Sequence, residues 1–450
     1  MSLINYELKP TGENLKKSIL NDMVGRNEAI ANFIKFLDAT EGNVAVALDD
    51  SWGNGKTFFV KQTQLVLQSY NSLNNDLIGV KNCMSKIFKN HIPKNYFPIY
   101  YDAWNNDNDV DPVLSIMFTM LQDLAYLQDY ETNNKSLWDK ITSGLELVST
   151  TFGGPRIKQF LDSIKGENIL SELKKSKDID QVLNEMFDTV LEKYPNDTRI
   201  IFFVDELDRC CPSFAVSLLE RIKHYFWNEK VIFVFSINAL ELHHTIQRHY
   251  GNNFNADKYL DKFFDFTMPL PAADMTKFYQ TVKLDIWTTI NDIATRVIRK
   301  YNLSLREITR YVQHLKIAIP EKGTGRYSPS DFYFNMLIPF LIGLKIHNFK
   351  KYSDFINGEN FGDFVDIMQE DRLDEYCIIF LNNDETFDKV KYPNKKLVTF
   401  EDKFKPAYKC LFCNDNPDVI RPVPVLGGSI IANDRKKILE TISLMKSDQI

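Results

Sequence analysis

The sequence has few cysteines, six in 450 residues, and they are unevenly spaced. Small secreted domains held by disulfides carry cysteines densely, so this pattern excludes that class and favours a reduced protein. Positive charge is not in excess either, because 54 Lys and Arg stand against 60 Asp and Glu, a formal net charge of -6. No overall basic field therefore recruits nucleic acid, although the total says nothing about a local basic patch.

Long apolar runs are also missing. The opening stretch, MSLINYELKPTGENLKK, lacks the apolar segment of an export signal. The best membrane candidate is Phe334–Ile346, FNMLIPFLIGLKI. It is well short of the roughly 20 residues that span a bilayer, and Pro339 interrupts it. We therefore expect a buried helix there, no membrane span and a cytoplasmic location.

Apolar runs typical of strands alternate with helical patterns up to residue 271. The strand candidates are residues 44–48 (VAVAL), 97–101 (FPIYY), 199–204 (RIIFFV), 230–237 (KVIFVFSI) and 264–270 (FDFTMPL). Continuous apolar sequence, as in RIIFFV, suits a central parallel strand that is covered on both faces. The sequence predicts a three-layer α/β/α core with a parallel sheet over residues 1–271, with a helical insertion at about 105–197. A helical lid (272–320) and a mainly helical region of unknown role (321–450) follow.

A glycine-containing loop follows the first predicted strand. Residues 50–57 read DSWGNGKT, close to the phosphate loop G-x-x-x-x-G-K-[ST] between a strand and a helix. The glycines would let backbone N–H groups approach phosphate, the lysine would reach the β- and γ-phosphates, and the threonine hydroxyl would help to hold Mg²⁺. The predicted nucleotide-binding residues here are Trp52, Gly53, Asn54, Gly55, Lys56, Thr57 and Phe58.

Asp50 stands where the motif has its first glycine. A carboxylate there would either repel phosphate or point away from it, and aspartate tolerates unusual backbone dihedrals less well than glycine. The alternative is a glycine-rich turn with a lysine present by chance.

The strand RIIFFV ends in acids, at the edge where ligands bind in open α/β sheets. Asp205 is predicted to position Mg²⁺, and Glu206 to polarise the attacking water. The alternative is a solvated acidic turn, but two motifs in the right order favour the catalytic interpretation. Nearby Arg209 would either contact a neighbouring subunit or hold the acidic turn through a salt bridge.

Five phrases resemble the KAP family of P-loop NTPases, relatives of the AAA+ ATPases. They are SWGNGKT, YYDAW, VDELDRCCPSFAVSLLERIKHYF, YGNNFNADKYLDKFFDFTMPLP and LSLREITRYVQHL, in the family's order over about residues 20–320. The resemblance implies ATP and Mg²⁺ as ligands. Many members carry membrane helices between the two nucleotide motifs, whereas this interval is charged and polar, as in a soluble member. The family includes bacterial proteins implicated in excluding phage, which suggests a role in antiviral defence.

The resemblance implies further roles for individual residues. Gly25 and Arg26 resemble the Gly-Arg segment beside adenine. Asn238 matches the position that helps to place the attacking water, and Lys262 lies about where relatives have an arginine finger, as a finger in trans or a surface charge. Arg306 matches the lid arginine that closes over the phosphates, with Arg310, one helical turn on, as the alternate.

Three functions follow as hypotheses. The first is an ATPase whose turnover drives a conformational change in an assembly, as a homo-oligomer or with an effector protein. The second is a nucleotide-gated binding module that turns over little ATP because of Asp50 and recruits an effector. The third, a nucleic-acid remodeller, is disfavoured by the acidic charge. No guanine-selective N-K-x-D motif is present in the expected place, which favours ATP over GTP.

Overall fold

The computed structural model describes residues 9–71, 76–108, 111–126, 183–184, 187–188, 190–191, 194–226, 228–282, 288–319, 329–369, 381, 400–413, 421–425 and 427–443. The chain divides into two compact units, an N-terminal unit, Leu8–Phe278, and a C-terminal unit formed mainly by Tyr279–Ile450. Most of the predicted helical insertion at about 105–197 lies outside the described residues. The predicted boundaries at 271 and 320 stay predictions.

A sheet of five parallel strands forms the centre of the N-terminal unit, in the order β2-β3-β4-β1-β5. The strands are β1 (Val44–Asp49), β2 (Tyr96–Asp102), β3 (Arg199–Asp205), β4 (Val231–Ile237) and β5 (Phe266–Pro269). β3 and β4 are buried along their whole length, as their continuous apolar sequences predict. All five strand predictions are confirmed, although the edge strand β5 is shorter than expected. Because the strands are parallel, their carboxyl ends lie along one edge.

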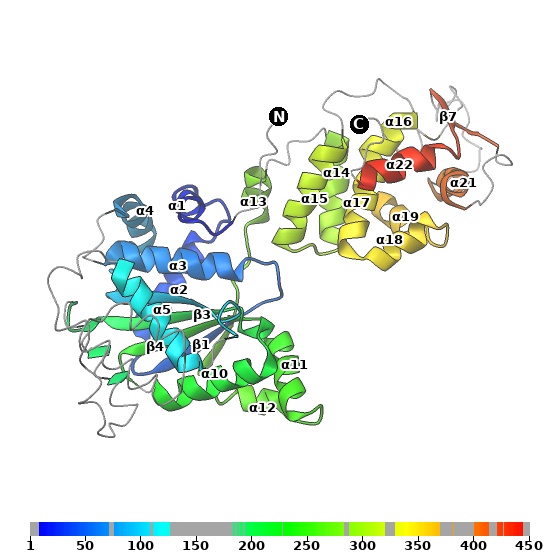
Figure 1. Cartoon of the computed structure of the whole chain (residues 1–450). Coiled ribbons are helices and arrows are strands. Elements are labelled where there is room, and N and C mark those ends of the chain that lie inside the picture. Colours follow the sequence, from blue (N-terminus) through cyan, green and yellow to red (C-terminus); the bar gives the residue numbers. More distant parts are fainter. Residues whose placement is uncertain are drawn as a thin grey trace, which may run out of the picture. The chain divides into compact units, whose positions relative to one another are not determined.

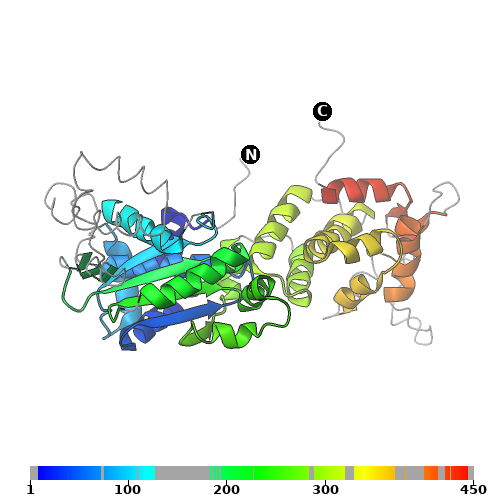
Figure 2. The ribbon, with the colours of Figure 1, turned by 60° about the horizontal axis from the view of Figure 1, so that its bottom comes forward.

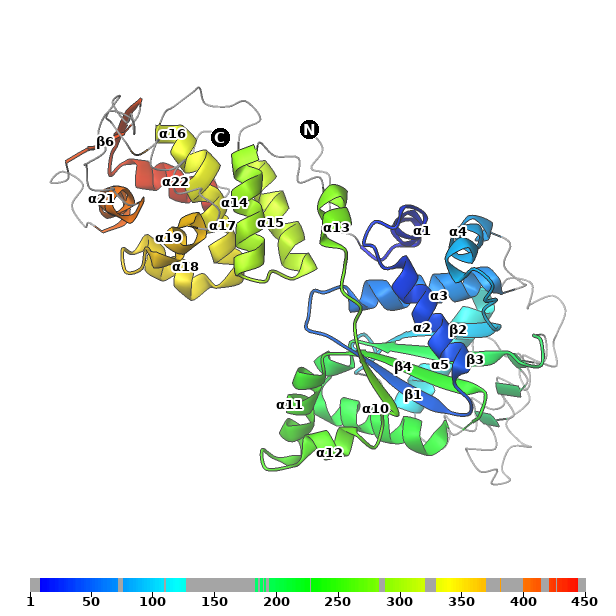
Figure 3. The same ribbon diagram turned by 180° about the vertical axis from the view of Figure 1, so that it is seen from behind.

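Helices cover both faces of this sheet and complete the three layers (Figure 1). One face packs against α1 (Gly12–Asn21), α2 (Asn27–Ala39), α3 (Lys56–Tyr70) and α4 (Ile78–Phe88), which Figure 3 shows from behind. The other packs against α5 (Pro112–Tyr126), α10 (Pro212–Tyr225), α11 (Ala239–Tyr250) and α12 (Ala256–Leu260). Figure 2 brings α10 and α11 forward. Successive side chains of β3 point to opposite faces of the sheet and pack in the two hydrophobic cores there. Ile201 and Phe203 pack against α1–α4, and Ile200 and Phe202 pack against the helices of the other face. The predicted α/β/α core is confirmed.

The C-terminal unit is mainly helical, as predicted. Its elements are α14 (Thr288–Lys300), α15 (Leu305–Ala318), α16 (Pro329–Phe332), the π-helix η2 (Tyr333–Leu337), α17 (Ile338–His347), α18 (Phe349–Ile356), α19 (Gly362–Gln369), α21 (Phe400–Phe412), β6 (Val423–Val425), β7 (Gly428–Ile430) and α22 (Asp434–Ser443). β6 and β7 form a short antiparallel hairpin. The helix α13 (Met275–Thr281) spans the division between the units.

The apolar segment that resembled a membrane candidate lies at the centre of this unit. Every residue of α17 from Ile338 to Leu344 is buried, and α17 packs against α14, α15 and α18. A Cβ on Gly343 would lie 2.2 Å from Val297 Cγ1 of α14, so only glycine allows the two helices to approach this closely. The expected buried helix is confirmed. Within the described ranges, no helix is both long and apolar enough to cross a membrane.

Candidate functional site

The loop between β1 and α3 presents free backbone donors at the carboxyl edge of the sheet. Gly53 and Gly55 have φ of 92° and 88°, the left-handed region that favours glycine. No side chain caps α3, and its first internal hydrogen bond is from Phe59 N to Gly55 O at 3.0 Å. The N–H groups of Lys56, Thr57 and Phe58 therefore open the helix without a helical acceptor, an arrangement that suits an anion.

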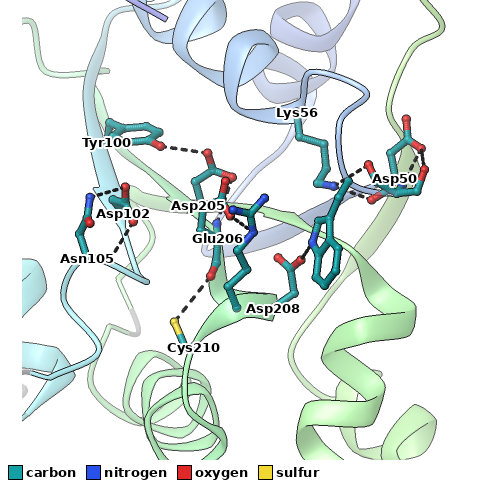
Figure 4. Close-up of polar contacts among 12 residues, drawn as sticks. Asp50, Lys56, Tyr100, Asp102, Asn105, Asp205, Glu206, Asp208 and Cys210 are labelled. Carbon is teal, nitrogen blue, oxygen red and sulfur yellow. Dashed lines mark hydrogen bonds and ion pairs between the residues drawn. The ribbon is translucent and has the colours of Figure 1, made fainter. Parts of the chain in front are cut away.

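The Lys56 ammonium is held by its own loop. Its Nζ donates to the carbonyl oxygens of Asp50 and Ser51, at 2.5 and 3.1 Å (Figure 4). Burial lowers the pKa of Lys56, whereas the surrounding acids raise it: Asp208, Asp50, Asp205 and Glu206. Two neutral carbonyl groups are weak partners for a buried cation, so this ammonium can exchange them for an anionic ligand.

Asp50 braces the loop from within. Its Oδ1 accepts hydrogen bonds from Ser51 N and Asn54 Nδ2, both at 2.7 Å. Its φ is not positive, so the backbone at this position does not require glycine. The carboxylate thus satisfies donors of its own loop, which supplies a structural reason for aspartate at this position.

Gly25 and Arg26 connect the start of α2 with the same loop. The buried Arg26 donates from Nη1 to the carbonyl oxygen of Asn54 at 3.1 Å, and burial lowers its pKa to about 10. Gly25 has a φ of 68°, and a Cβ there would lie 2.3 Å from Asp274 Cβ. Arg26 therefore supports the loop backbone in this structure, while the predicted contact of both residues with adenine stays a prediction.

The acidic end of β3 lies at the same edge, separated from β1 by β4. Asp205 is buried, with Oδ2 accepting from the Tyr100 hydroxyl at 2.9 Å and Oδ1 accepting from Glu206 N at 3.0 Å (Figure 4). Each oxygen keeps a further lone pair for a ligand. Tyr100 belongs to the phrase YYDAW, but its role here depends on β2 pairing with β3, which the sequence alone does not reveal.

Glu206 turns sharply out of the strand, with a φ of 61°. Its Oε2 forms an ion pair with Nε of Arg209, so the expected salt bridge of the acidic turn is present. Burial and the charge of Asp205 raise the pKa of Glu206 to about 7, against the opposing effect of Arg209. A carboxyl group with a pKa near neutral is suited to exchange a proton with water.

Asp208 ties the acidic turn to the phosphate loop. It is buried within the 3₁₀ turn η1 (Leu207–Arg209), and its Oδ2 accepts from Trp52 Nε1 at 2.5 Å. It also accepts from the backbone of Asn238, and burial raises its pKa. Sequence reasoning gave Asp208 no role, because the signal is a contact between residues far apart in the chain.

The end of β4 contributes two polar residues. Asn238 caps α11, with Oδ1 accepting from Glu241 N at 3.4 Å, and its role toward water stays a prediction. Ser236 was not predicted, because it lies in a continuous apolar run. It pairs in register with Asp205, and its buried hydroxyl has no hydrogen-bond partner among the residues that the structure describes.

Three other predicted residues take different places. The Thr57 hydroxyl, on the first turn of α3, has no hydrogen bond within the described part of the chain. Lys262 is exposed and precedes β5, whose first residue pairs with Val46 in β1, so it lies toward the amino ends of the strands. Lys262 therefore lies away from the phosphate loop and the acidic turn of the same chain. Arg306 is exposed on α15 of the C-terminal unit. The roles of all three stay predictions.

The sheet order, the glycine loop before an uncapped helix and the acidic strand end together define the fold of a P-loop NTPase. A family model described as KAP family P-loop domain matches residues 26–320. The chain therefore belongs to the KAP family, and nucleotide binding is the property that this membership supports. No curated protein matches the chain.

Proposed function

We propose that the protein binds ATP–Mg²⁺ at the carboxyl edge of the sheet, hydrolyses it, and uses turnover to change conformation within an assembly. The observation that carries this proposal is the juxtaposition of Lys56 with the acidic turn. Trp52 of the phosphate loop donates to Asp208, and the charges of Asp208, Asp205 and Glu206 raise the pKa of Lys56. These acids lie at the end of β3, two places from β1 in the sheet. A phosphate-binding cation and a candidate base thus share one edge.

The residues fit a nucleotide with its metal. The free N–H groups of α3 and the Lys56 ammonium would bind phosphate oxygens, and the ammonium would leave the carbonyl oxygens of Asp50 and Ser51 to do so. The Thr57 hydroxyl and the Asp205 carboxylate supply the oxygen ligands that Mg²⁺ prefers. When bound, Mg²⁺ neutralises negative charge on the phosphates.

Glu206 acts as the general base. Its ionised carboxylate accepts a proton as water attacks the γ-phosphate, and Asn238 helps to orient that water. The family resemblance assigns to Arg306 the role of a lid arginine toward the phosphates. Lys262 acts from a neighbouring subunit, which requires a homo-oligomer. The setting suggested by the family resemblance is cytoplasmic antiviral defence.

A second candidate is a nucleotide-gated module that turns over little ATP and recruits an effector or nucleic acid. The observation in its favour is the Asp50 carboxylate, which brings negative charge to a loop that must accept phosphate. Turnover separates the two candidates directly.

ATP turnover of the full chain tests the proposal, with binding measured in parallel for the wild type, Glu206→Gln and Lys56→Ala. We expect turnover to be lost in both variants and binding to be kept only in Glu206→Gln. Lys86→Ala, an exposed position on α4, serves as the charge-matched control. Binding without turnover in the wild type would favour the gated module, and the absence of binding would reject both candidates.

A further inference from the structure

Arg209 lies where three elements of the site meet. Its Nε pairs with Glu206 Oε2 at the end of β3. Its guanidinium carbon lies 5.6 Å from the ring centroid of Trp52, in the phosphate loop, and 5.5 Å from that of Trp104, in the turn after β2. Both distances are within the range of favourable cation–π contacts. The guanidinium therefore touches a partner from each of the three elements.

The two tryptophans are themselves anchored, although Trp52 is 44% exposed and Trp104 is 50% exposed. Trp52 donates to the buried Asp208. The turn that carries Trp104 is fixed by a hydrogen bond from Ala103 N to the carbonyl oxygen of Asp205, at 3.0 Å, and by Asn105, whose side chain donates to Asp102. Two anchored aromatic rings therefore hold a cation beside the candidate base.

We propose that Arg209 is a positioning residue for the reaction: Trp52 and Trp104 hold its guanidinium so that it fixes the Glu206 carboxylate beside the phosphate loop. This inference rests on the proposed function. Arg209 engages Oε2 and leaves Oε1 free to accept a proton from water. Arginine serves both contacts, because the planar guanidinium stacks on aromatic rings while its edge donates to a carboxylate, whereas lysine would supply the charge with less of the stacking.

Loss of Arg209 is expected to affect the catalytic step and not ATP binding. Arg209 contacts the phosphate loop through the Trp52 ring. It makes no contact with Lys56 or with the first turn of α3 among the interactions of the described residues, so its loss leaves the Lys56 ammonium and the N–H groups of α3 in place. The Glu206 carboxylate, in contrast, becomes free to rotate away from the attacking water. A small misplacement of a catalytic group costs on the order of 100-fold in rate.

The test measures kcat and KM for ATP with the full chain. We expect Arg209→Gln to lower kcat by about 10- to 100-fold while KM changes by less than about threefold. Arg209→Lys, which keeps the cation, should restore part of kcat. Trp104→Ala should lower kcat by about threefold to tenfold, since it acts through Arg209, and should add little to Arg209→Gln in the double variant. Arg248→Gln, at an exposed arginine on α11, is the matched control.

Several results would overturn the inference. An unchanged kcat in Arg209→Gln would show that the Arg209–Glu206 ion pair does not contribute to the reaction. A raised kcat would show that the ion pair inhibits Glu206. An equal loss in Arg209→Lys, or additive losses in the double variant, would point to a general disturbance of folding. A wild type without turnover would remove the proposed function and this inference with it, whereas an active wild type that Arg209→Gln matches would remove the inference alone. Unchanged ATP affinity shows that each variant is folded.

Discussion

Buried charged clusters lie at both ends of the strands of the central sheet, at the amino edge and at the carboxyl edge. They differ in how many of their polar groups have hydrogen-bond partners within the protein. At the amino edge, Asp38 accepts hydrogen bonds from the Tyr96 hydroxyl at 2.7 Å, from Lys94 N at 3.3 Å and from His91 at 2.6 Å. Nearby Arg199, at the start of β3, donates to Thr40 and Gly42. At the carboxyl edge, the Lys56 ammonium donates hydrogen bonds only to main-chain carbonyl oxygens within the described part of the chain, and the first N–H groups of α3 have no helical acceptor.

The difference separates a structural cluster from a ligand site. Buried polar groups are normally satisfied within the protein, and those that are not are completed by a ligand or water. The amino-edge cluster is nearly complete, with only the Nε of Arg199 lacking a partner among the described residues of the cluster. The carboxyl edge has free donors, a free hydroxyl at Ser236 and a cation held by neutral groups. We infer that the amino edge stabilises the fold and that the carboxyl edge is suited to bind a ligand.

The largest effect is expected for Asp38→Ala. It removes the acceptor of three donors and leaves the charge of Arg199 without its nearby carboxylate, so we expect a loss of about 3 kcal/mol in the free energy of unfolding. Denaturant unfolding measures this loss, and ATP affinity should change less than about twofold. Asp188→Ala breaks an exposed ion pair with Lys230 and should cost less than about 1 kcal/mol. Equal losses in the two variants would contradict the comparison.

The carboxyl edge should gain stability only when its ligand is present. Saturating ATP–Mg²⁺, at about 100 times the dissociation constant, should stabilise the wild type by about 2.7 kcal/mol in the same unfolding experiment. Asp38→Ala should gain as much as the wild type, because the mutated cluster lies at the opposite edge. Lys56→Ala should gain almost nothing at that ATP concentration. A smaller gain in Asp38→Ala would show that the two edges are coupled.

Asp50 offers a sharper test of the carboxyl edge. Asp50→Ala removes the acceptor of Ser51 N and of the Asn54 amide, so the loop loses its brace, and ATP should bind about tenfold more weakly, or about 1.4 kcal/mol. Asp50→Asn keeps an acceptor oxygen without the charge and should bind nearly as well as the wild type. Tighter binding in both variants would show instead that the carboxylate repels phosphate.

The sequence was sufficient to predict the strands and the phosphate loop, because apolar runs and motif spacing are local properties. The contacts across the site depend on which strands are neighbours. Tyr100 reaches Asp205 only because β2 pairs with β3, and Trp52 meets Asp208 only because the two loops face each other. Ser236 gave no signal, since one serine in an apolar strand resembles a tolerated core residue. The strands and loops that form the site were therefore predictable, and the contacts between their side chains were not.

The smallest effect is expected at Asp123, a mostly buried carboxylate on α5 that lies outside both clusters. Burial raises its pKa to about 6 from an ordinary value of 3.8, although a hydrogen bond with the Tyr100 backbone opposes the shift. Because the folded state favours the protonated form, the ionised form costs stability above about pH 6, and this cost disappears as the pH falls toward 4. Asp123→Asn should therefore stabilise the protein by about 1 kcal/mol at pH 8, allowing for partial exposure.

The comparison of wild type and Asp123→Asn across pH isolates this one carboxylate, since every other titrating group is common to both proteins. We expect the difference in the free energy of unfolding to shrink steadily between pH 7 and pH 4. A constant difference would mean that asparagine alters packing and not charge. A difference of opposite sign at pH 8 would mean that the hydrogen bond with the Tyr100 backbone outweighs the cost of burial. Asp123 would then belong, like Asp38, to the satisfied carboxylates that hold the fold together.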